Sequence, residues 1–436
     1  MNSFTRNMKP LSSRRSATLS VLDIGTNKVV CLVAELRPTD GLESLKARTH
    51  LARIIGIGHQ RSLGIKAGAI VDLDAAEMSI RQAVHAAERM AKVEIQSVIV
   101  NMSGGRVGSQ HYEAEIGVRG PVSNNDLYRV LETASRHDPR TGRVPLHALP
   151  TGFMLDAQRS IIDPTGMVGE KLGVDLHVVT AEGAATRNLM LAVERCHLGV
   201  EAVIATPYAA GLSALVDDEA EMGCAVIDFG AGTTSTSVFA NGYLVHTDVI
   251  AVGGHHITMD IARGLSTRVA SAERIKTLYG STISSSADDR DLIAVPQVDE
   301  DERDIPNHVP KSHLVRIIRP RVEEILELVH DRLKHTGFLG IASRRIVLTG
   351  GGSQLVGMPE VTRQIFKGQV RIGRPLGIKG LPEAAKGPAF STAVGLLVYP
   401  QVSHAEYFEP RSSGFFKGTG TDGYFSRVGR WLRDSF

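Results

Sequence analysis

The feature that most constrains the fold is a strand–turn–strand segment that occurs twice in this chain of 436 residues. In each copy an apolar strand ends in Asp, one further residue and Gly, and a small polar turn leads into a second apolar strand. The copies span residues 19–35 and 223–239, and their aspartates, Asp23 and Asp228, lie 205 residues apart. Solenoid repeats are only about 20–50 residues long. The repeat therefore favours two related halves over a solenoid.

Both turns have the composition of a phosphate-binding backbone. A triphosphate needs N–H donors at close range, and glycine lets the backbone approach it. One Asp-x-Gly turn is weak evidence, because many ordinary hairpins contain one. Two in matching contexts, followed by the strand and glycine turn of residues 345–353, predict a nucleotide held between the halves. The sequence contains no GxxxxGK[ST] motif, which excludes a P-loop.

The expected chemistry assigns a role to each turn. Asp23 and Asp228 would hold a hydrated Mg²⁺ through water, because Mg²⁺ keeps much of its hydration shell, and Lys28 would add a positive charge. The triple-glycine turn would pack against adenine and ribose, unless it is an ordinary helix-entry turn. The nucleotide-binding residues predicted from these turns are Asp23, Gly25, Thr26, Asn27, Lys28, Asp228, Gly230, Gly232, Thr233, Thr234, Gly350, Gly351, Gly352 and Ser353.

Composition excludes several other kinds of protein. Basic residues number 49 and acidic residues 47, so no overall basic field indicates a nucleic-acid partner. Cys31, Cys196 and Cys224 lie in apolar runs without a CxxC pair, which predicts buried thiols in a reducing compartment. No apolar run approaches the roughly 20 residues that span a bilayer, and the N-terminus lacks the apolar core of a signal peptide. We therefore expect a cytoplasmic protein.

Periodicity predicts the main elements outside the repeated hairpins. Helices are expected over residues 74–91, capped by Asp72 or Asp74, and over residues 315–333. A further helix, capped by Asn124 or Asn125, is expected to run through Ser135. The acidic residues 288–304 are expected to form an exposed loop. Residues 98–176 combine short strand-like runs with one helical pattern, unlike the segments on either side, and so predict an inserted α+β module.

These observations predict an α/β protein with two halves around a nucleotide cleft, each half carrying an insert. The expected segments are a flexible tail 1–17, a first half 18–97 and 177–216, its insert 98–176, a second half 217–265 and 340–400, its insert 266–339, a flexible linker 401–423 and a terminal helix 424–436.

The last 13 residues have the pattern of an interfacial helix. At about 100° per residue their large apolar side chains share one arc, and the arginines occupy the opposite face. A long linker and a basic polar face favour binding to anionic lipid over docking on the protein itself. The predicted membrane-binding residues are Tyr424, Phe425, Arg427, Val428, Arg430, Trp431, Leu432, Arg433 and Phe436.

The order of these motifs resembles the actin-like ATPase superfamily, in which two ribonuclease-H-like α/β halves enclose the nucleotide. Within it, the chain resembles the FtsA family of bacterial cell-division proteins. The resemblance rests on the two hairpin turns, Ala-Glu-x-Ile-Lys at 272–276, Thr-Gly-Gly-Gly at 349–352, residues 204–210, 370–375 and 391–397, the insert in the first half and the terminal helix.

The resemblance implies a function. It implies binding of ATP and Mg²⁺, self-association, and tethering of the tubulin-like division protein FtsZ to the cytoplasmic membrane at the division septum, alongside other division proteins. It assigns Glu273 and Lys276 to the ribose and adenine, where the alternative is a surface ion pair. It places the C-terminal peptide of FtsZ on the second insert near Arg321, where the alternative is a solvated helix charge.

One departure from the superfamily concerns hydrolysis. Vigorous filament ATPases carry Glu just before the proline that corresponds to Pro207, and a carboxylate there can orient the attacking water. This chain has Ala205 and Thr206 instead. Glu182 is nearby in the sequence and could take its place, and a structural role at a helix start explains Glu182 equally well. At most a slow ATPase is expected. The rival functions are a small-molecule kinase and a pilus-assembly ATPase of the same fold.

Overall fold

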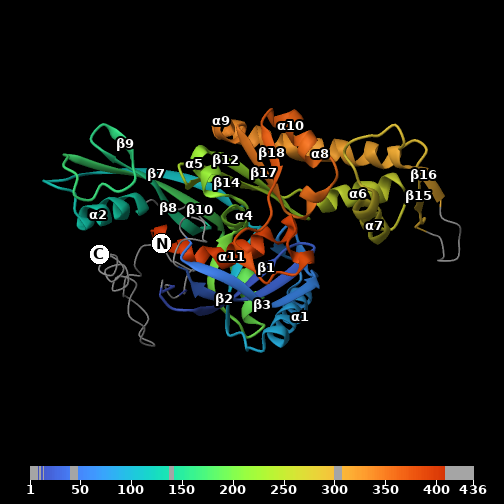
Figure 1. Cartoon of the computed structure of the whole chain (residues 1–436), viewed down its shortest axis with the longest axis horizontal. Coiled ribbons are helices and arrows are strands. Elements are labelled where there is room, and N and C mark those ends of the chain that lie inside the picture. Colours follow the sequence, from blue (N-terminus) through green and yellow to red (C-terminus); the bar gives the residue numbers. More distant parts are fainter. Residues whose placement is uncertain are drawn as a thin grey trace.

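The computed structural model describes Met8 and residues 11–12, 14–39, 48–136, 142–298 and 307–407. Two α/β halves lie one above the other, and one further lobe projects from each side (Figure 1). The lower half contains β1, β2, β3 and α1, and the upper half contains β12, β17 and β18. The left-hand lobe contains α2 and β9, and the right-hand lobe contains α6, α7, β15 and β16.

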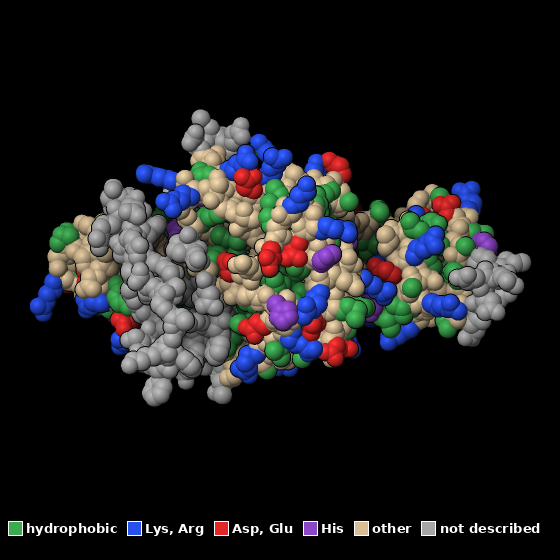
Figure 2. Space-filling model, turned by 90° about the horizontal axis from the view of Figure 1, so that it is seen from below, with side chains coloured by type: hydrophobic (Ala, Val, Ile, Leu, Met, Phe, Trp, Pro, Cys, Tyr) green, Lys and Arg blue, Asp and Glu red, His purple; other side chains and the backbone are tan. Residues whose placement is uncertain are grey.

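The first half is built on a six-stranded sheet in the order β11-β6-β1-β2-β3-β19. Its strands are β1 Ala17–Ile24, β2 Lys28–Pro38, β3 His50–Arg61, β6 Ser97–Met102, β11 Gly199–Ala205 and β19 Ile378–Lys379. Its helices are α1 Leu73–Ala91, α3 Gly183–Glu194, α4 Thr206–Ala214 and α11 Ser391–Val402, with the short pair β4 Ile65–Lys66 and β5 Ala69–Ile70. Viewed from below, this half presents acidic and basic side chains mixed over one face (Figure 2).

The second half repeats the same plan. Its strands run β18-β17-β12-β13-β14, which matches β11-β6-β1-β2-β3 strand for strand. They are β12 Cys224–Phe229, β13 Thr234–Ala240, β14 Tyr243–Ile250, β17 Arg345–Thr349 and β18 Gln369–Ile372. The helices of this half and of the right-hand lobe are α5 Asp217–Met222, α6 Gly254–Gly264, α7 Val269–Tyr279, α8 Lys311–His335, α9 Leu339–Ala342 and α10 Met358–Phe366. The two related halves predicted from the repeat are confirmed.

Helix starts follow from local hydrogen bonding. The Asp72 carboxylate accepts from the amides of Asp74 and Ala75, both at 3.1 Å, so Asp72 caps α1. Helix α2, Asn124–Ser135, is capped by Ser123 and not by either asparagine. Ser123 and Asp126 exchange side-chain and backbone hydrogen bonds, and this reciprocal capping box outcompetes a single asparagine cap.

The first insert consists of β7 Gly108–Gly117, α2, β8 Arg143–Leu155, β9 Gln158–Ile161 and β10 Lys171–Glu182. The predicted bounds 98–176 are wrong at both ends. Strand β6 is an apolar run because it is buried between β1 and β11 of the first half, and β10 continues to Glu182. Strands β14 and β7 pair at Asp248 and Gly108, which joins the insert to the sheet of the second half.

The second insert contains a hairpin that its acidic composition concealed. Strands β15 Leu292–Val295 and β16 Asn307–Pro310 pair antiparallel, so residues 288–304 are not simply an exposed loop. Ile293 and Val295 are buried, and the buried Asp288 carboxylate accepts from Ser285 N at 2.7 Å. Alternating burial is a strand signal that the surrounding charges masked.

Both chain ends are more ordered than predicted within the described residues. Met8 packs into the core of the first half, and Arg15 O lies 3.1 Å from His50 Nε2, so the flexible tail 1–17 is wrong for this part. The linker prediction 401–423 is wrong over 401–407, because α11 runs to Val402, a 3₁₀ turn spans Ser403–Ala405, and Glu406 is buried. Residues 408–436, including every predicted membrane-binding residue, lie outside the described part.

Among the residues that the structure describes, no helix is long and apolar enough to span a bilayer.

Candidate functional site

The two Asp-x-Gly turns close in the same way. Gly25 N donates to Lys28 O at 3.0 Å, and Gly230 N donates to Thr233 O at 3.0 Å. Each aspartate stands opposite a residue seven positions further along in its hairpin, Asp23 opposite Val30 and Asp228 opposite Ser235. The repeated sequence therefore produces a repeated geometry, at the ends of the central strands β1 and β12.

The two turns face each other across the halves. A Cβ placed on Gly232 would overlap the side chain of Thr26, so the hairpins meet in van der Waals contact. Thr26 is itself held by Gly68 N, which donates to its hydroxyl at 3.1 Å. The absence of a side chain at position 232 is what allows this approach.

Three charged side chains meet between the turns. Burial raises the pKa of Asp23 to about 6, with Asp228 adding to the rise and Lys28 opposing it. Burial likewise raises the pKa of Asp228 to about 6, opposed by Thr392 and Lys28. Burial also lowers the pKa of Lys28, against the two carboxylates. Two desolvated carboxylates beside one ammonium form a site that lacks positive charge, as expected of a cation site.

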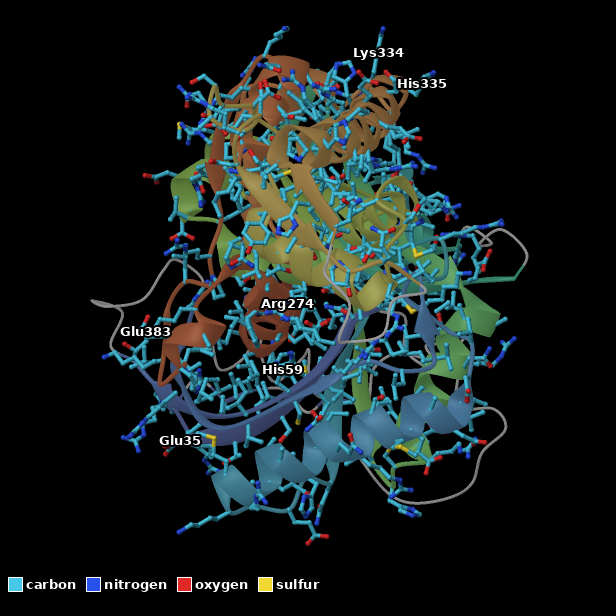
Figure 3. All side chains as sticks on the ribbon, turned by 90° about the vertical axis from the view of Figure 1, so that its right-hand side faces the viewer. Glu35, His59, Arg274, Lys334, His335 and Glu383 are labelled. Atoms are coloured by element: carbon cyan, nitrogen blue, oxygen red, sulfur yellow. The ribbon has the colours of Figure 1, made fainter. Side chains whose placement is uncertain are left out.

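The Lys28 side chain is oriented by the segment directly before α11. Its ammonium donates to Ala389 O and lies 3.6 Å from the centroid of the Phe390 ring. The Phe390 ring also packs edge-on against the ring of His59, with 5.9 Å between the two centroids; Figure 3 labels His59 on the lower half. Gly350 N of the second half donates to Pro388 O at 3.2 Å, so the segment before α11 links both halves at the site.

Each aspartate is held by a residue that the sequence analysis missed. Asn101, at the end of β6, donates from Nδ2 to Asp23 Oδ1 at 2.8 Å and accepts from Ile24 N at 2.7 Å. Thr392, in the first turn of α11, donates to Asp228 Oδ2 at 3.2 Å. Asn101 could have been found as a polar residue ending an otherwise apolar strand, while the contact of Thr392 comes from residues 164 apart.

The triple-glycine turn packs against the second Asp-x-Gly turn. Gly350 has φ +82°, and a Cβ there would overlap the Asp228 carboxylate. A Cβ on Gly352 would overlap the Phe229 ring. The buried Ser353 hydroxyl donates to Gly350 O at 2.7 Å, so Ser353 holds the turn in place, whereas Gly351 is exposed. Glycine is required here by sterics and by a left-handed backbone.

Glu273 and Lys276 of α7 form the ion pair that was the alternative prediction. Lys276 Nζ lies 2.7 Å from Glu273 Oε2, 2.8 Å from Thr258 Oγ1 and 3.1 Å from Gly254 O. Gly254 N in turn donates to Gly230 O at 2.9 Å. The pair therefore stands one residue away from the second turn, through the start of α6.

Two predicted residues, Thr234 and Glu182, have side chains that are paired away from this set. Thr234 is buried and donates to Val252 O at 2.8 Å, which ties β13 to the strand end after β14. Asn27 has an exposed side chain, and its backbone oxygen accepts from Ser62 N at 3.0 Å. Glu182 is the N-cap residue of α3, and its carboxylate pairs with the exposed Arg106 at 3.3 Å. The structural interpretation of Glu182 fits this geometry.

The Arg321 side chain forms ion pairs within the right-hand lobe of Figure 1. Its guanidinium contacts both oxygens of Asp260 of α6, at 2.5 and 3.2 Å, and Glu324 at 2.5 Å. Burial opposes these contacts, yet the Asp260 hydrogen bond dominates and raises the pKa of Arg321. Arg321 therefore joins α8 to α6 and is not a solvated helix charge.

Two topologically equivalent halves, with paired Asp-x-Gly turns meeting between them, define an actin-like fold. Solved structures agree. The chain superposes on the PilM–PilN type IV pilus biogenesis complex with a TM-score of 0.62 and 17% identity, covering 88% of this chain and 99% of the other. It superposes on MreB5 of Spiroplasma citri bound to ADP with a TM-score of 0.52 and 16% identity, covering 90% and 98%.

The chain belongs to the FtsA family of cell-division proteins. The family model "Cell division protein FtsA" matches residues 225–395, and "SHS2 domain inserted in FTSA" matches 104–180. FtsA of Rhizobium meliloti (strain 1021) is 56% identical over 430 residues, 98% of this chain and 97% of that protein. FtsA of Escherichia coli (strain K12) is 34% identical over 426 residues, covering 95% and 97%. This membership does not favour the kinase or pilus-assembly alternatives.

Proposed function

We propose that this cell-division protein binds ATP with Mg²⁺, assembles into filaments, and tethers FtsZ to the cytoplasmic membrane at the division septum. The observation that carries the proposal is the meeting of Asp23, Lys28 and Asp228 between two turns of identical construction. The ADP-bound MreB5, which shares the fold, supports a nucleotide at the equivalent place.

In this proposal the glycine-bearing turns supply backbone donors to the phosphates. Lys28 supplies positive charge, and Asp23 and Asp228 hold Mg²⁺ through its water shell. The buried carboxylates fit a cation. A divalent cation would stabilise their ionised forms and so oppose the effect of burial, which raises their pKa values. Glu273 and Lys276 would rearrange from their own ion pair to reach the nucleoside.

Calorimetry tests the nucleotide proposal. The expected result is binding of ATP that strengthens with Mg²⁺, and loss of the Mg²⁺ effect in Asp228→Ala. Asp331→Ala, which removes an exposed carboxylate of α8, is the matched control. No heat from the folded wild-type protein with ATP and Mg²⁺ would exclude the proposal.

Turnover is proposed to be slow. Thr206 stands before Pro207, and its hydroxyl accepts from Asn101 Nδ2 at 3.1 Å, so this position carries no carboxylate to orient water. Within the described residues, the ion pair of Glu182 is with Arg106. A phosphate-release assay is expected to give the same slow rate for wild type and Glu182→Gln; a large loss in the variant would make Glu182 catalytic.

The membrane tether is proposed to be the segment 424–436. Large apolar side chains each contribute up to about 1.5–3 kcal/mol on full burial, and ordering a short helix offsets much of this. One segment therefore binds weakly, and a filament presenting many copies gains by effective concentration. Filament assembly, controlled by ATP, would thus control membrane residence.

Co-sedimentation with vesicles of anionic lipid tests the tether. Deleting 424–436 is expected to abolish binding, and Trp431→Glu should weaken it strongly. Replacing Arg427, Arg430 and Arg433 by Ser should weaken it and remove its salt dependence. Undiminished binding by the truncated chain would contradict the tether.

The FtsZ tail is proposed to dock on the lobe formed by α6, α7, β15, β16 and α8. Arg321 would act by holding α8 against α6 through Asp260. Arg321→Ala should weaken binding of an FtsZ tail peptide, measured by fluorescence anisotropy. Arg319→Ala, which removes a neighbouring arginine paired with Glu323, is the control. Equal affinity in all three proteins would remove Arg321 from the proposal.

A further inference from the structure

His147 of β8 lies where four parts of the molecule meet. Its side chain is fully buried, and the Tyr208 and Tyr399 rings pack edge-on against it at centroid distances of 5.0 and 5.7 Å. Tyr208 belongs to α4 and Tyr399 to α11, the pair of helices between the two sheets. The insert therefore sends one histidine into the centre of the protein.

Hydrogen bonding fixes the tautomer of this histidine. Ala205 N lies 2.9 Å from His147 Nε2, and an amide can only donate, so Nε2 accepts. In the neutral ring the proton is then on Nδ1, which lies 3.1 and 3.2 Å from the two carboxylate oxygens of Glu406. His147 donates to Glu406 on one side and receives from Ala205 on the other.

Glu406 stands at the end of the described chain, beyond α11. It is 4% exposed, and the following amide, Tyr407 N, donates to Ala148 O at 2.8 Å. A buried carboxylate is costly unless it is hydrogen-bonded. His147 supplies that hydrogen bond, so residues 406–407 are docked on β8 by one side-chain and one backbone contact.

The Ala205 side of His147 leads to the nucleotide site. Ala205 ends β11 and precedes Thr206, whose hydroxyl accepts from Asn101 Nδ2 at 3.1 Å. The same Nδ2 donates to Asp23 Oδ1 at 2.8 Å. All of these side chains are buried, and each contact has hydrogen-bonding geometry. An unbroken set of contacts thus joins Asp23 to Glu406.

We propose that His147 and Glu406 are positioning residues for the nucleotide site. They fix the Ala205–Thr206 turn, and through Asn101 they fix the Asp23 carboxylate. The inference rests on the proposed binding of ATP and Mg²⁺. Because coupling between two sites is reciprocal, nucleotide with Mg²⁺ also strengthens the docking of residues 406–407 by the same factor. The segment that leads to the C-terminal tail is then held more firmly in the loaded protein.

Two substitutions separate the two contacts of His147. In His147→Asn the amide nitrogen stands in for Nδ1 and keeps the contact to Glu406, while the contact to Ala205 is lost. In His147→Gln the amide oxygen stands in for Nε2 and keeps the contact to Ala205. Both remove the ring, so they share its packing loss. His147→Asn is expected to weaken ATP binding about tenfold with Mg²⁺ and to leave Mg²⁺-free ATP binding unchanged, and His147→Gln, which keeps the contact to Ala205, to bind more tightly than His147→Asn.

Amide hydrogen exchange tests the reciprocal effect. In the wild-type full chain, Mg²⁺ and ATP are expected to slow exchange in peptides covering 399–407 about tenfold. Glu406→Ala should lose this effect, and Glu406→Gln, which still accepts from Nδ1, should recover it. Glu219→Gln is the control, because Glu219 is an equally buried carboxylate paired elsewhere, with Arg371.

The outcomes separate this inference from the proposed function. A wild-type protein that does not bind ATP would refute the proposed function. If the wild type binds ATP, equal Mg²⁺-dependent affinity in both His147 variants would overturn the inference. Exchange at 399–407 that is indifferent to nucleotide would also overturn it. Lowered thermal stability with the Mg²⁺ dependence intact would reduce both residues to a structural role.

Discussion

At the scale of single residues, the buried and ionised Asp23 and Asp228 destabilise the folded protein, and a bound cation would offset this destabilisation. The raised pKa of Asp228, about 6, means that ionisation in the folded state is disfavoured relative to the unfolded chain. A carboxyl whose pKa is raised by folding destabilises the folded protein above that pKa. This destabilisation disappears as the pH falls through 6 towards 3.8, the pKa of Asp in the unfolded chain.

We therefore expect Asp228→Asn to stabilise the free protein at pH 7.5, by up to about 3 kcal/mol, while abolishing Mg²⁺-dependent ATP binding. Urea unfolding at pH 7.5 and pH 5, with Asp331→Asn as the exposed control, measures this; a loss of stability at pH 7.5 would contradict it.

At the scale of elements, the contact between the insert and the second half includes aromatic rings, because His111 of β7 stacks on Phe338 at a centroid distance of 5.9 Å. His111 of β7 and His177 of β10 stack at 4.8 Å, and Phe338, between α8 and α9, stacks on His246 of β14 at 4.7 Å. Burial lowers the pKa of His246 to about 4, with His111 lowering it further and Asp248 opposing, and burial also lowers the pKa of His177 and of His111. Above pH 6.5 His246 is neutral in both the folded and the unfolded chain. Between pH 6.5 and pH 4 the unfolded chain binds a proton at His246, whereas the folded chain does not.

Between pH 7.5 and 5 the free energy of unfolding of the wild type should therefore fall by about 2 kcal/mol because of His246. His246→Leu should lack that loss, whereas Phe338→Leu should show a curve parallel to wild type; parallel curves for all three proteins would count against buried, neutral histidine at this junction.

At the scale of the whole molecule, the sequence predicts the repeated hairpins but not the hydrogen bonds between residues far apart in the chain. The Asp-x-Gly turns and the two related halves follow from local patterns that recur 205 residues apart. Asn101 and Thr392 escaped notice because their partners lie 78 and 164 residues away along the chain. Glu406 was assigned to a linker because its neighbourhood is polar, and only the fold brings it to His147, 259 residues distant.

The contact of the two halves gives a last prediction at this scale. Gly232 has an unstrained backbone, so Gly232→Ala is penalised only by overlap with the Thr26 side chain. The added methyl group should hold the turns apart and weaken ATP binding roughly tenfold, the equivalent of about 1.4 kcal/mol. Thr26→Gly in the same chain removes the overlap, so the double variant should bind more tightly than Gly232→Ala alone. Small-angle scattering should show Gly232→Ala slightly more extended than both wild type and double variant. Affinities that simply add across this cycle would mean that the turns do not meet in the working protein.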